Sequence, residues 1–286
     1  MALAVVLAGP GTAAAGVAAP PADSGDGLVF VALGDSRASG PRLEPMYPDD
    51  CSRSYDNYAG RIARALDVAE FTDVSCSAAR VENIIDTPQL IPARWPVQLD
   101  SVRPDTDLIT LSIGGNDSNN LLLGPLCAAP GPGTDRGCRN DPLTRKVAAS
   151  GIDRAAAGLD RVLAALTERA PHARIYLIGE GGAIGTRGCW PNVPMSDADA
   201  AWFSGYFADY NAEFAAVAAA RGVRVIDIAT AAIAGGHDAC AAPEDRWFEG
   251  MFSESDAQRL HLTHAGMAAV ADRVVADVDT DPITAR

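Results

Sequence analysis

Short runs of consecutive apolar residues recur along the chain, with amphipathic segments between them. Four runs are clear, at residues 28–33, 108–113, 175–178 and 223–228, and a weaker one covers residues 68–74. Strands that are buried on both faces of a parallel sheet have this composition. The runs therefore predict a parallel sheet whose strands are spread over the whole chain.

Three of the intervening segments carry apolar residues at helical spacing. Residues 152–166 place them three and four positions apart, residues 203–217 repeat the pattern with aromatic side chains, and residues 267–278 give a terminal example. Ser196 and Asp197 precede the second segment and are suited to cap a helix. Strands that alternate with helices predict a single α/β domain with right-handed crossovers and helices on both faces of the sheet.

Two stretches interrupt this alternation, residues 119–142 and residues 179–194, and both are predicted as long ordered loops. Each follows a predicted strand, and open α/β sheets bind ligands at the carboxyl ends of their strands. We therefore expect both loops to border the functional site. Leu121, Leu122 and Leu123 in the first loop are candidates either for an apolar acyl site or for ordinary packing.

Acidic residues outnumber basic ones by 37 to 23, which gives a formal charge of -14. A chain with this charge is repelled by nucleic-acid backbones and by anionic lipid surfaces, so we expect no nucleic-acid partner. Beyond the first 22 residues, no apolar stretch approaches the roughly 20 residues that span a bilayer. We expect a monomer without a stable membrane span.

The first 22 residues resemble a signal peptide. They hold an apolar run followed by a tract of Ala, Gly and Pro, although they lack the basic residues with which such a leader normally begins. We expect residues 1–22 to be a leader, residues 28–286 to form the domain, and the protein to be extracellular.

The chain has six cysteines, an even number that fits an exported protein with three disulfides. There is no CxxC pair and no His at zinc-finger spacing, which argues against a metal site. The sequence does not choose among the pairings. We favour the pairing of neighbours, and free buried thiols in a cytosolic protein are the alternative. The favoured bonds are Cys51–Cys76, Cys127–Cys138 and Cys189–Cys240.

Residues with catalytic potential follow two predicted strands and begin the last helix. Ser36, in Gly-Asp-Ser, comes directly after the first strand, beside a helix N-terminus. Asn116, in Gly-Gly-Asn-Asp, follows the third strand at the same edge and is suited to donate to a developing oxyanion. His264 starts the terminal helix, whose dipole disfavours its charged form, so it is a candidate base. Each feature alone fits an ordinary turn or surface residue, but together they indicate a serine hydrolase.

These segments resemble those of the SGNH hydrolases, also called GDSL-type esterases and lipases. Residues 33–40 (LGDSRASG) are similar to the first block of that family, residues 113–117 (IGGND) to the third, and residues 261–266 (HLTHAG) to the last. Two further segments, residues 51–58 and 76–77, look like the secreted actinobacterial branch, whose members carry three disulfides. The resemblance covers nearly the whole chain after residue 28 and implies a flavodoxin-like, three-layer α/β/α fold.

Carried over position by position, the resemblance implies that Ser36 is the nucleophile, His264 the general base and Asn116 a side-chain donor of the oxyanion hole. The N–H groups of Ser36 and Ala78 complete that hole, although Ala78 stands where the family normally has Gly. Arg37 follows the nucleophile at a position where a neutral residue is common. We expect it to pair with a local carboxylate, and selection of anionic substrates is the alternative.

The position three before His264, usually Asp in the family, is His261. We expect the backbone carbonyl of His261 to accept the Nδ1–H of His264 and to orient it, which makes a Ser–His dyad. The alternative is a carboxylate recruited from elsewhere, with Asp256 and Glu254 as the nearest candidates in sequence.

Two further pairs of residues receive a structural interpretation. Asp35 and Asp117 are expected to fix their loops by accepting backbone N–H groups, with no catalytic role. His261 and His264 have the i, i+3 spacing of metal ligands, but no third ligand is indicated nearby, so we expect no metal.

The sequence therefore predicts an exported carboxylic ester hydrolase that acts by two-step acyl transfer and needs no cofactor. Its substrate is a small-molecule or lipid ester, and lipid, short-chain and carbohydrate esters all stay open. The rival is a secreted binding protein on the same fold, weakened in catalysis by the loss of the family's Gly and Asp. Covalent labelling of Ser36 by a fluorophosphonate probe would separate the two.

Overall fold

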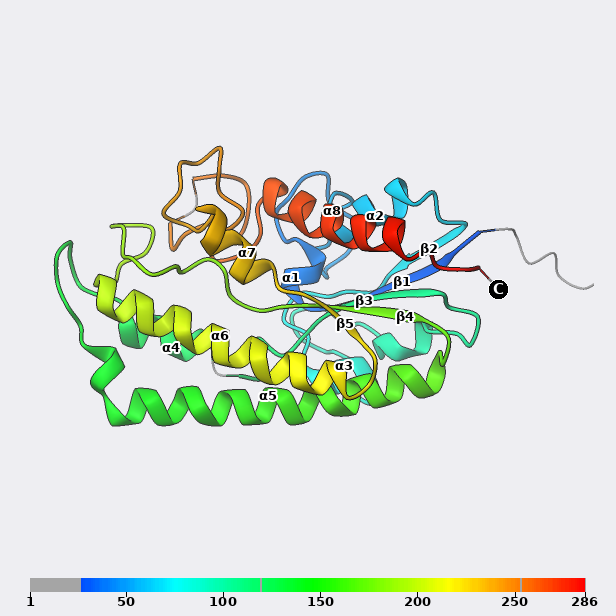
Figure 1. Cartoon of the computed structure of the whole chain (residues 1–286), viewed down its shortest axis with the longest axis horizontal. Coiled ribbons are helices and arrows are strands. Elements are labelled where there is room, and N and C mark those ends of the chain that lie inside the picture. Colours follow the sequence, from blue (N-terminus) through cyan, green and yellow to red (C-terminus); the bar gives the residue numbers. More distant parts are fainter. Residues whose placement is uncertain (1–26, 119, 253, 286) are drawn as a thin grey trace, which may run out of the picture.

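Five strands form one parallel sheet, and each apolar run of the sequence supplies one strand (Figure 1). The order across the sheet is β2-β1-β3-β4-β5, the flavodoxin-like order implied by the resemblance. The computed structural model describes residues 27–118, 120–252 and 254–285, so the leader expected at residues 1–22 lies outside the described residues. The strands are β1 (Val29–Gly34), β2 (Glu70–Asp73), β3 (Leu108–Ser112), β4 (Arg174–Ile178) and β5 (Arg224–Ile226).

Helices cover both faces of this sheet. They are α1 (Ser36–Ser39), α2 (Tyr58–Ala65), α3 (Val81–Ile85), α4 (Asn120–Cys127), α5 (Pro142–Arg169), α6 (Asp197–Ala219), α7 (Ile228–Gly235) and α8 (His264–Thr280), with 3-10 turns at Gln98–Ser101 and Cys138–Asn140. Figure 1 shows α2, α7 and α8 above the sheet and α3, α5 and α6 below it. The three-layer α/β/α prediction is confirmed.

The predicted helices are α5, α6 and α8, and α5 begins earlier than its apolar pattern indicated. Asp141 caps it, because its side chain accepts from the backbone N–H of Thr144, and Pro142 takes the first turn. The prediction of a simple loop over residues 119–142 is wrong, since that stretch also contains α4. Leu123 of α4 is fully buried in the core, so packing overrides a composition rich in Gly and Pro.

Alternate residues of β1 point into two separate hydrophobic cores. Phe30 and Ala32 pack with residues of α2 and α8, whereas Val31 and Leu33 pack with residues of α5 and α6. This alternation follows from the period of two in a strand, and the burial of both faces explains the continuous apolar runs. The carboxyl ends of the strands, where the chain leaves the sheet, are therefore held from both sides.

All three favoured disulfides are present: Cys51–Cys76, Cys127–Cys138 and Cys189–Cys240. They lie in segments that follow the carboxyl ends of the strands. The backbone N–H of Ser77 donates to the Cys51 carbonyl at 2.9 Å, beside the first bond. The disulfides therefore fasten loops at the edge of the sheet where ligands bind in such folds.

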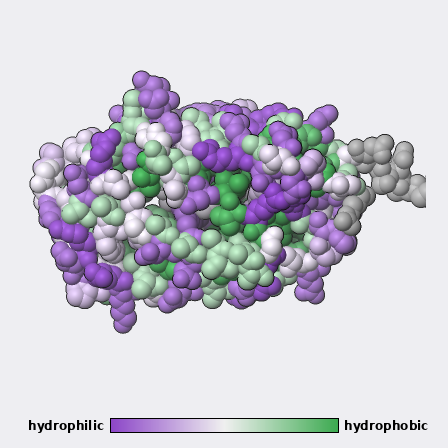
Figure 2. Space-filling view, viewed as in Figure 1, coloured by the Kyte–Doolittle hydropathy of each residue, from purple (hydrophilic) through white to green (hydrophobic). Residues whose placement is uncertain are grey.

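Polar side chains cover most of the face drawn in Figure 2, and apolar ones gather near its centre. Within the described part of the chain, no helix has both the length and the apolar character needed to cross a bilayer.

Removal of the Cys189–Cys240 disulfide should cost more stability than removal of Cys127–Cys138, because the two bonds close segments of 51 and 11 residues. Loop-closure entropy in the unfolded chain gives losses of about 4 and about 3 kcal/mol. Urea unfolding of the two paired Cys→Ser variants measures both values. Equal losses or the reverse order would contradict the expectation.

Candidate active site

Ser36 emerges where β1 ends and a single helical turn begins. The backbone N–H of Asp35 donates to the carbonyl of Ser112 at the end of β3, at 3.0 Å. The Asp35 side chain then caps α1 by accepting from the N–H of Arg37 at 2.9 Å. The expectation that Asp35 fixes its loop is confirmed, and the cap holds Ser36 at the first position of α1, half-buried at the sheet edge.

The histidine that contacts Ser36 is His261. Its Nε2 lies 2.7 Å from Ser36 Oγ, and its Nδ1 lies 2.8 Å from the backbone carbonyl of Arg259. A carbonyl only accepts hydrogen bonds, so Nδ1 carries the proton and Nε2 presents its lone pair to the serine hydroxyl. This tautomer is the one that a general base for Ser36 requires.

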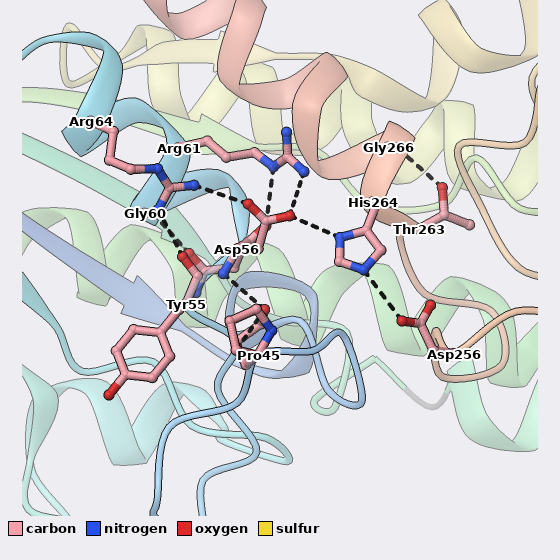
Figure 3. Close-up of polar contacts among 12 residues, drawn as sticks. Pro45, Tyr55, Asp56, Gly60, Arg61, Arg64, Asp256, Thr263, His264 and Gly266 are labelled. Atoms are coloured by element: carbon pink, nitrogen blue, oxygen red, sulfur yellow. Dashed lines mark hydrogen bonds and ion pairs between the residues drawn. The ribbon is translucent and has the colours of Figure 1, made fainter.

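The prediction that His264 meets Ser36 is wrong. His264 is the first residue of α8, and its ring nitrogens face Asp56 and Asp256 (Figure 3). The two histidines have different partners because His261 lies on the extended segment that precedes the helix, where Phe248 and Leu262 form an antiparallel bridge.

The prediction that the backbone carbonyl of His261 orients the base is also wrong. That carbonyl accepts from the N–H of Glu249 at 2.9 Å and belongs to the strand-like pairing. Of the two carboxylates weighed as its alternative, Asp256 does lie 3.3 Å from His264 Nε2, but His264 is not the histidine that contacts Ser36; Glu254 pairs with Arg246. The main-chain carbonyl that faces Nδ1 of His261 is that of Arg259.

One signal in the sequence could have distinguished the two histidines. Thr263 is the N-cap of α8, with its side chain accepting from the N–H of Gly266, and Thr is a preferred residue at that position. A cap at Thr263 places His264 inside the helix and leaves His261 as the histidine that precedes it. The family's last block has its histidine before the final helix, so the cap favours His261.

Asn116 and Ala78 lie together beside the serine. The Asn116 side-chain amide donates to the Ala79 carbonyl at 2.9 Å, and its nitrogen is 3.5 Å from Asp35 Oδ2. Gln89 holds the same loop by donating to the Ser77 carbonyl at 2.8 Å. The structure therefore brings Ser36, His261, Asn116 and the Ala78 loop to one place.

Ala78 takes the backbone conformation that a glycine would favour. Its φ is 67°, in the left-handed region, which an alanine occupies at a cost of about 1 kcal/mol. The alanine therefore holds a turn that glycine would form without this cost. Asp117 holds the start of α3 from the other side, since its Oδ2 lies 3.3 Å from the N–H of Val81, and its expected structural role is confirmed.

A buried group of charges lies directly behind the nucleophile. Arg37 Nε is 3.3 Å from Glu180 Oε2, and its guanidinium donates to the Gly181 carbonyl at 3.1 Å. Arg37 is 9 % exposed and Glu180 5 % exposed, so neither faces solvent. The expected pairing of Arg37 with a local carboxylate is confirmed, and selection of anionic substrates by this side chain is excluded by its burial.

Burial shifts the pKa values of three groups in the site, Asp35, Glu180 and His261. Desolvation raises the pKa of Asp35, and the charge of Glu180 adds to this effect. Desolvation also raises the pKa of Glu180, although Arg37 opposes the change. For His261, removal from water lowers the pKa to about 4; the Arg259 carbonyl opposes this shift and the Arg37 charge adds to it. The imidazole is therefore neutral at pH values well above about 4.

Both long loops are expected to border the site, and the loop at residues 179–194 does so. Glu180 and Gly181, which hold Arg37, open the 179–194 loop. In the other stretch, Leu123 is buried, Leu122 is 58 % exposed, and the side chain of Leu121 lies outside the described residues. A separate cavity of about 320 Å³ lies between the two stretches, where its lining includes Pro132 and Trp190.

Comparison with known proteins finds a matching family, a relative in sequence and similar solved structures. The model of the GDSL-like Lipase/Acylhydrolase family matches residues 32–269. Lipase 2 of Streptomyces coelicolor is 31% identical over 266 residues, which are 90% of this chain and 88% of that protein. Among solved structures, the extracellular lipase of Streptomyces rimosus superposes with a TM-score of 0.69 at 25% identity, over 87% of this chain and 99% of its own. A phospholipase A1 of Streptomyces albidoflavus shares the fold, with a TM-score of 0.72 at 24% identity, over 88% of this chain and 99% of its own.

Replacement of Arg37 by Met should destabilise the fold by about 3–5 kcal/mol, because it leaves the buried Glu180 carboxylate without its cation. The double variant Arg37→Met, Glu180→Gln should recover much of the loss, since it removes both charges. Arg161→Met is the matched control: its pair with Asp86 is exposed and should contribute less than about 1 kcal/mol. Urea unfolding measures all three, and additive losses in the double variant would contradict the pairing.

Proposed function

The chain belongs to the GDSL-like lipase/acylhydrolase family and is a carboxylic ester hydrolase, and on that premise we propose that it cleaves its esters through Ser36 with His261 as the general base. The observation that carries this assignment is the 2.7 Å contact between Ser36 Oγ and His261 Nε2. Both atoms lie at the carboxyl edge of the sheet, where α/β enzymes bind their substrates.

The reaction proceeds by two acyl transfers. His261 takes the hydroxyl proton as Ser36 attacks the ester carbonyl, and the resulting tetrahedral oxyanion collapses when His261 gives that proton to the leaving alcohol. A water molecule then attacks the acyl-enzyme with His261 again as base, and the carboxylic acid leaves. The oxyanion is stabilised in both halves by the N–H groups of Ser36 and Ala78 and by the Asn116 amide.

The base works without a carboxylate partner. The Arg259 carbonyl at 2.8 Å from Nδ1 fixes the tautomer and accepts from the imidazolium that forms during catalysis. This arrangement is the dyad expected from the sequence, with the base and its carbonyl at His261 and Arg259. The rival binding-protein function loses its basis, because Ala78 keeps the glycine conformation and a carbonyl occupies the place of the missing acid.

Lipid esters are the proposed substrates. Large apolar side chains are exposed on the loop after α3 and on α4, which follows the Asn116 turn: Leu90 and Ile91 are 65% and 83% exposed, and Leu122 is 58% exposed. Gln89 fastens the first loop to Ser77, next to Ala78. The relatives named lipases support the same class, and the three disulfides together with the extracellular relative support export.

Replacement of His261 by Ala should lower kcat by more than about 1,000-fold, because the serine loses its base. Asn116→Ala should lower kcat by about 100-fold or more, the usual loss for one oxyanion donor. Hydrolysis of nitrophenyl esters measures both, and His172→Ala at an exposed turn is the matched control. Full activity in His261→Ala would refute the assignment, and hydrolysis of short-chain esters alone would refute the lipid preference.

The pH profile should show a base that stays active in acid. A base must be neutral, so kcat/KM should hold as pH falls and be half-lost near the His261 pKa of about 4. Activity is present above that value and disappears below it. Initial rates from pH 3 to 8, with circular dichroism to monitor folding, test this point, and a half-loss near the ordinary histidine value of about 6.5 would contradict it.

A further inference from the structure

His264 lies between two carboxylates that belong to different parts of the chain (Figure 3). Its Nδ1 is 2.9 Å from Oδ2 of Asp56, just before α2, and its Nε2 is 3.3 Å from Oδ2 of Asp256. Asp256 lies in the segment 250–260 that leads directly to His261. The histidine at the start of α8 therefore joins this segment to the start of α2.

Both contacts are hydrogen bonds only when both ring nitrogens carry a proton. An ionised carboxylate accepts but does not donate, and a neutral imidazole has a single N–H. A neutral ring would leave one carboxylate facing a nitrogen lone pair. The geometry is therefore that of an imidazolium with two charge-assisted hydrogen bonds.

Charges of both signs surround the ring. Arg61 and Arg64 of α2 pair with Asp56 and hold its carboxylate in place. These arginines and the N-terminus of α8 oppose a positive ring, whereas Asp56 and Asp256 favour it. On the side of Asp256, a cavity of about 180 Å³ has further charged side chains in its lining: Arg246, Glu249 and Glu254.

Polar contacts hold the 250–260 segment in position. Most of its described residues are exposed or half-buried, with Gly250 and Ala257 buried among them. On one side Glu254 pairs with Arg246 and accepts from Asn192, and on the other Asp256 pairs with His264. Between them, Ser255 donates to Glu249 through its N–H and its hydroxyl, at 3.0 and 2.6 Å. Among these anchors, His264 is the one that joins the segment to the start of α2.

We propose that His264 is a positioning residue, whose imidazolium fastens Asp256 to Asp56 and thereby holds the Arg259 carbonyl against His261. This inference rests on the proposed role of His261 as the base. Gln258, two residues after Asp256, accepts from the backbone N–H of His261 at 3.1 Å, and Arg259 accepts from its ring at 2.8 Å. A displaced segment turns the imidazole away from Ser36, which lowers kcat and leaves KM unchanged.

Steady-state kinetics of single and double variants test the anchor. His264→Ala should lower kcat by about 10- to 100-fold, the effect of a small misplacement of a catalytic group, with KM changed by less than about twofold. The double variant His264→Ala, Asp256→Ala should be no worse than His264→Ala, because both changes remove the same anchor. His172→Ala, at an exposed histidine outside the site, should keep full activity. An unchanged kcat in His264→Ala, or additive losses, would overturn the proposal.

The charge of the ring gives a readout that a purely structural role would not change. His264→Lys keeps a cation with several donors and should restore most of kcat. Nitrogen-15 NMR at neutral pH should show both His264 nitrogens protonated. A singly protonated ring, or a kcat in His264→Lys as low as in His264→Ala, would overturn the proposal.

Failure of this inference can be told from failure of the proposed function. An active His261→Ala variant would remove the function on which the inference depends. An inactive His261→Ala beside a fully active, folded His264→Ala would remove only the positioning role. Thermal unfolding of each variant separates a loss of kcat from a loss of fold.

Discussion

The place of the reactive serine depends on a close approach between two neighbouring strands. Gly34, the last residue of β1, pairs with Ser112 of β3 and has a φ of 144°. A Cβ at this position would lie 2.4 Å from the Ser112 carbonyl oxygen, so glycine is required. Gln98 holds the same residue, since its side-chain amide accepts from the Gly34 N–H at 2.8 Å and donates to its carbonyl at 2.9 Å. These contacts fix the direction of the backbone after β1, so that Ser36 lies near the turn that contains Asn116.

The sheet could be predicted from the sequence because strands buried on both faces carry continuous apolar runs, and the long helices because one face of each packs on that sheet. Helices such as α4 could not be predicted from the sequence, since their stability comes from tertiary contacts of a few side chains such as Leu123. Local motifs located Ser36 and Asn116, which follow strands directly. The partner of Ser36 depends on how a loop pairs with Phe248 some distance away, and the spacing of two histidines carries no information on that pairing.

Among the buried charges behind the nucleophile, Arg37 acts on both the carboxylates and the catalytic histidine. Asp35 must be buried to cap α1, and Glu180 lies against the Gly-Gly-Asn-Asp turn, where a Cβ on Gly115 would be 3.1 Å from its carboxylate. Two carboxylates in a dry region repel each other, and Arg37 between them offsets part of that repulsion. The same cation lies close enough to His261 to disfavour a second positive charge there, which keeps the ring in its basic form.

The orientation of His261 by the main chain bears on how this gene can change over time. An orienting aspartate is lost by a single codon change, whereas the carbonyl of Arg259 is present whichever amino acid is encoded at that position. What the lineage must preserve is the length and turn of a loop, closed by a 3.3 Å bond from the Leu260 N–H to the Gly250 carbonyl and by the positive φ of Leu260. The orienting group therefore survives replacement of the Arg259 side chain, whereas an insertion or deletion in this loop would displace it.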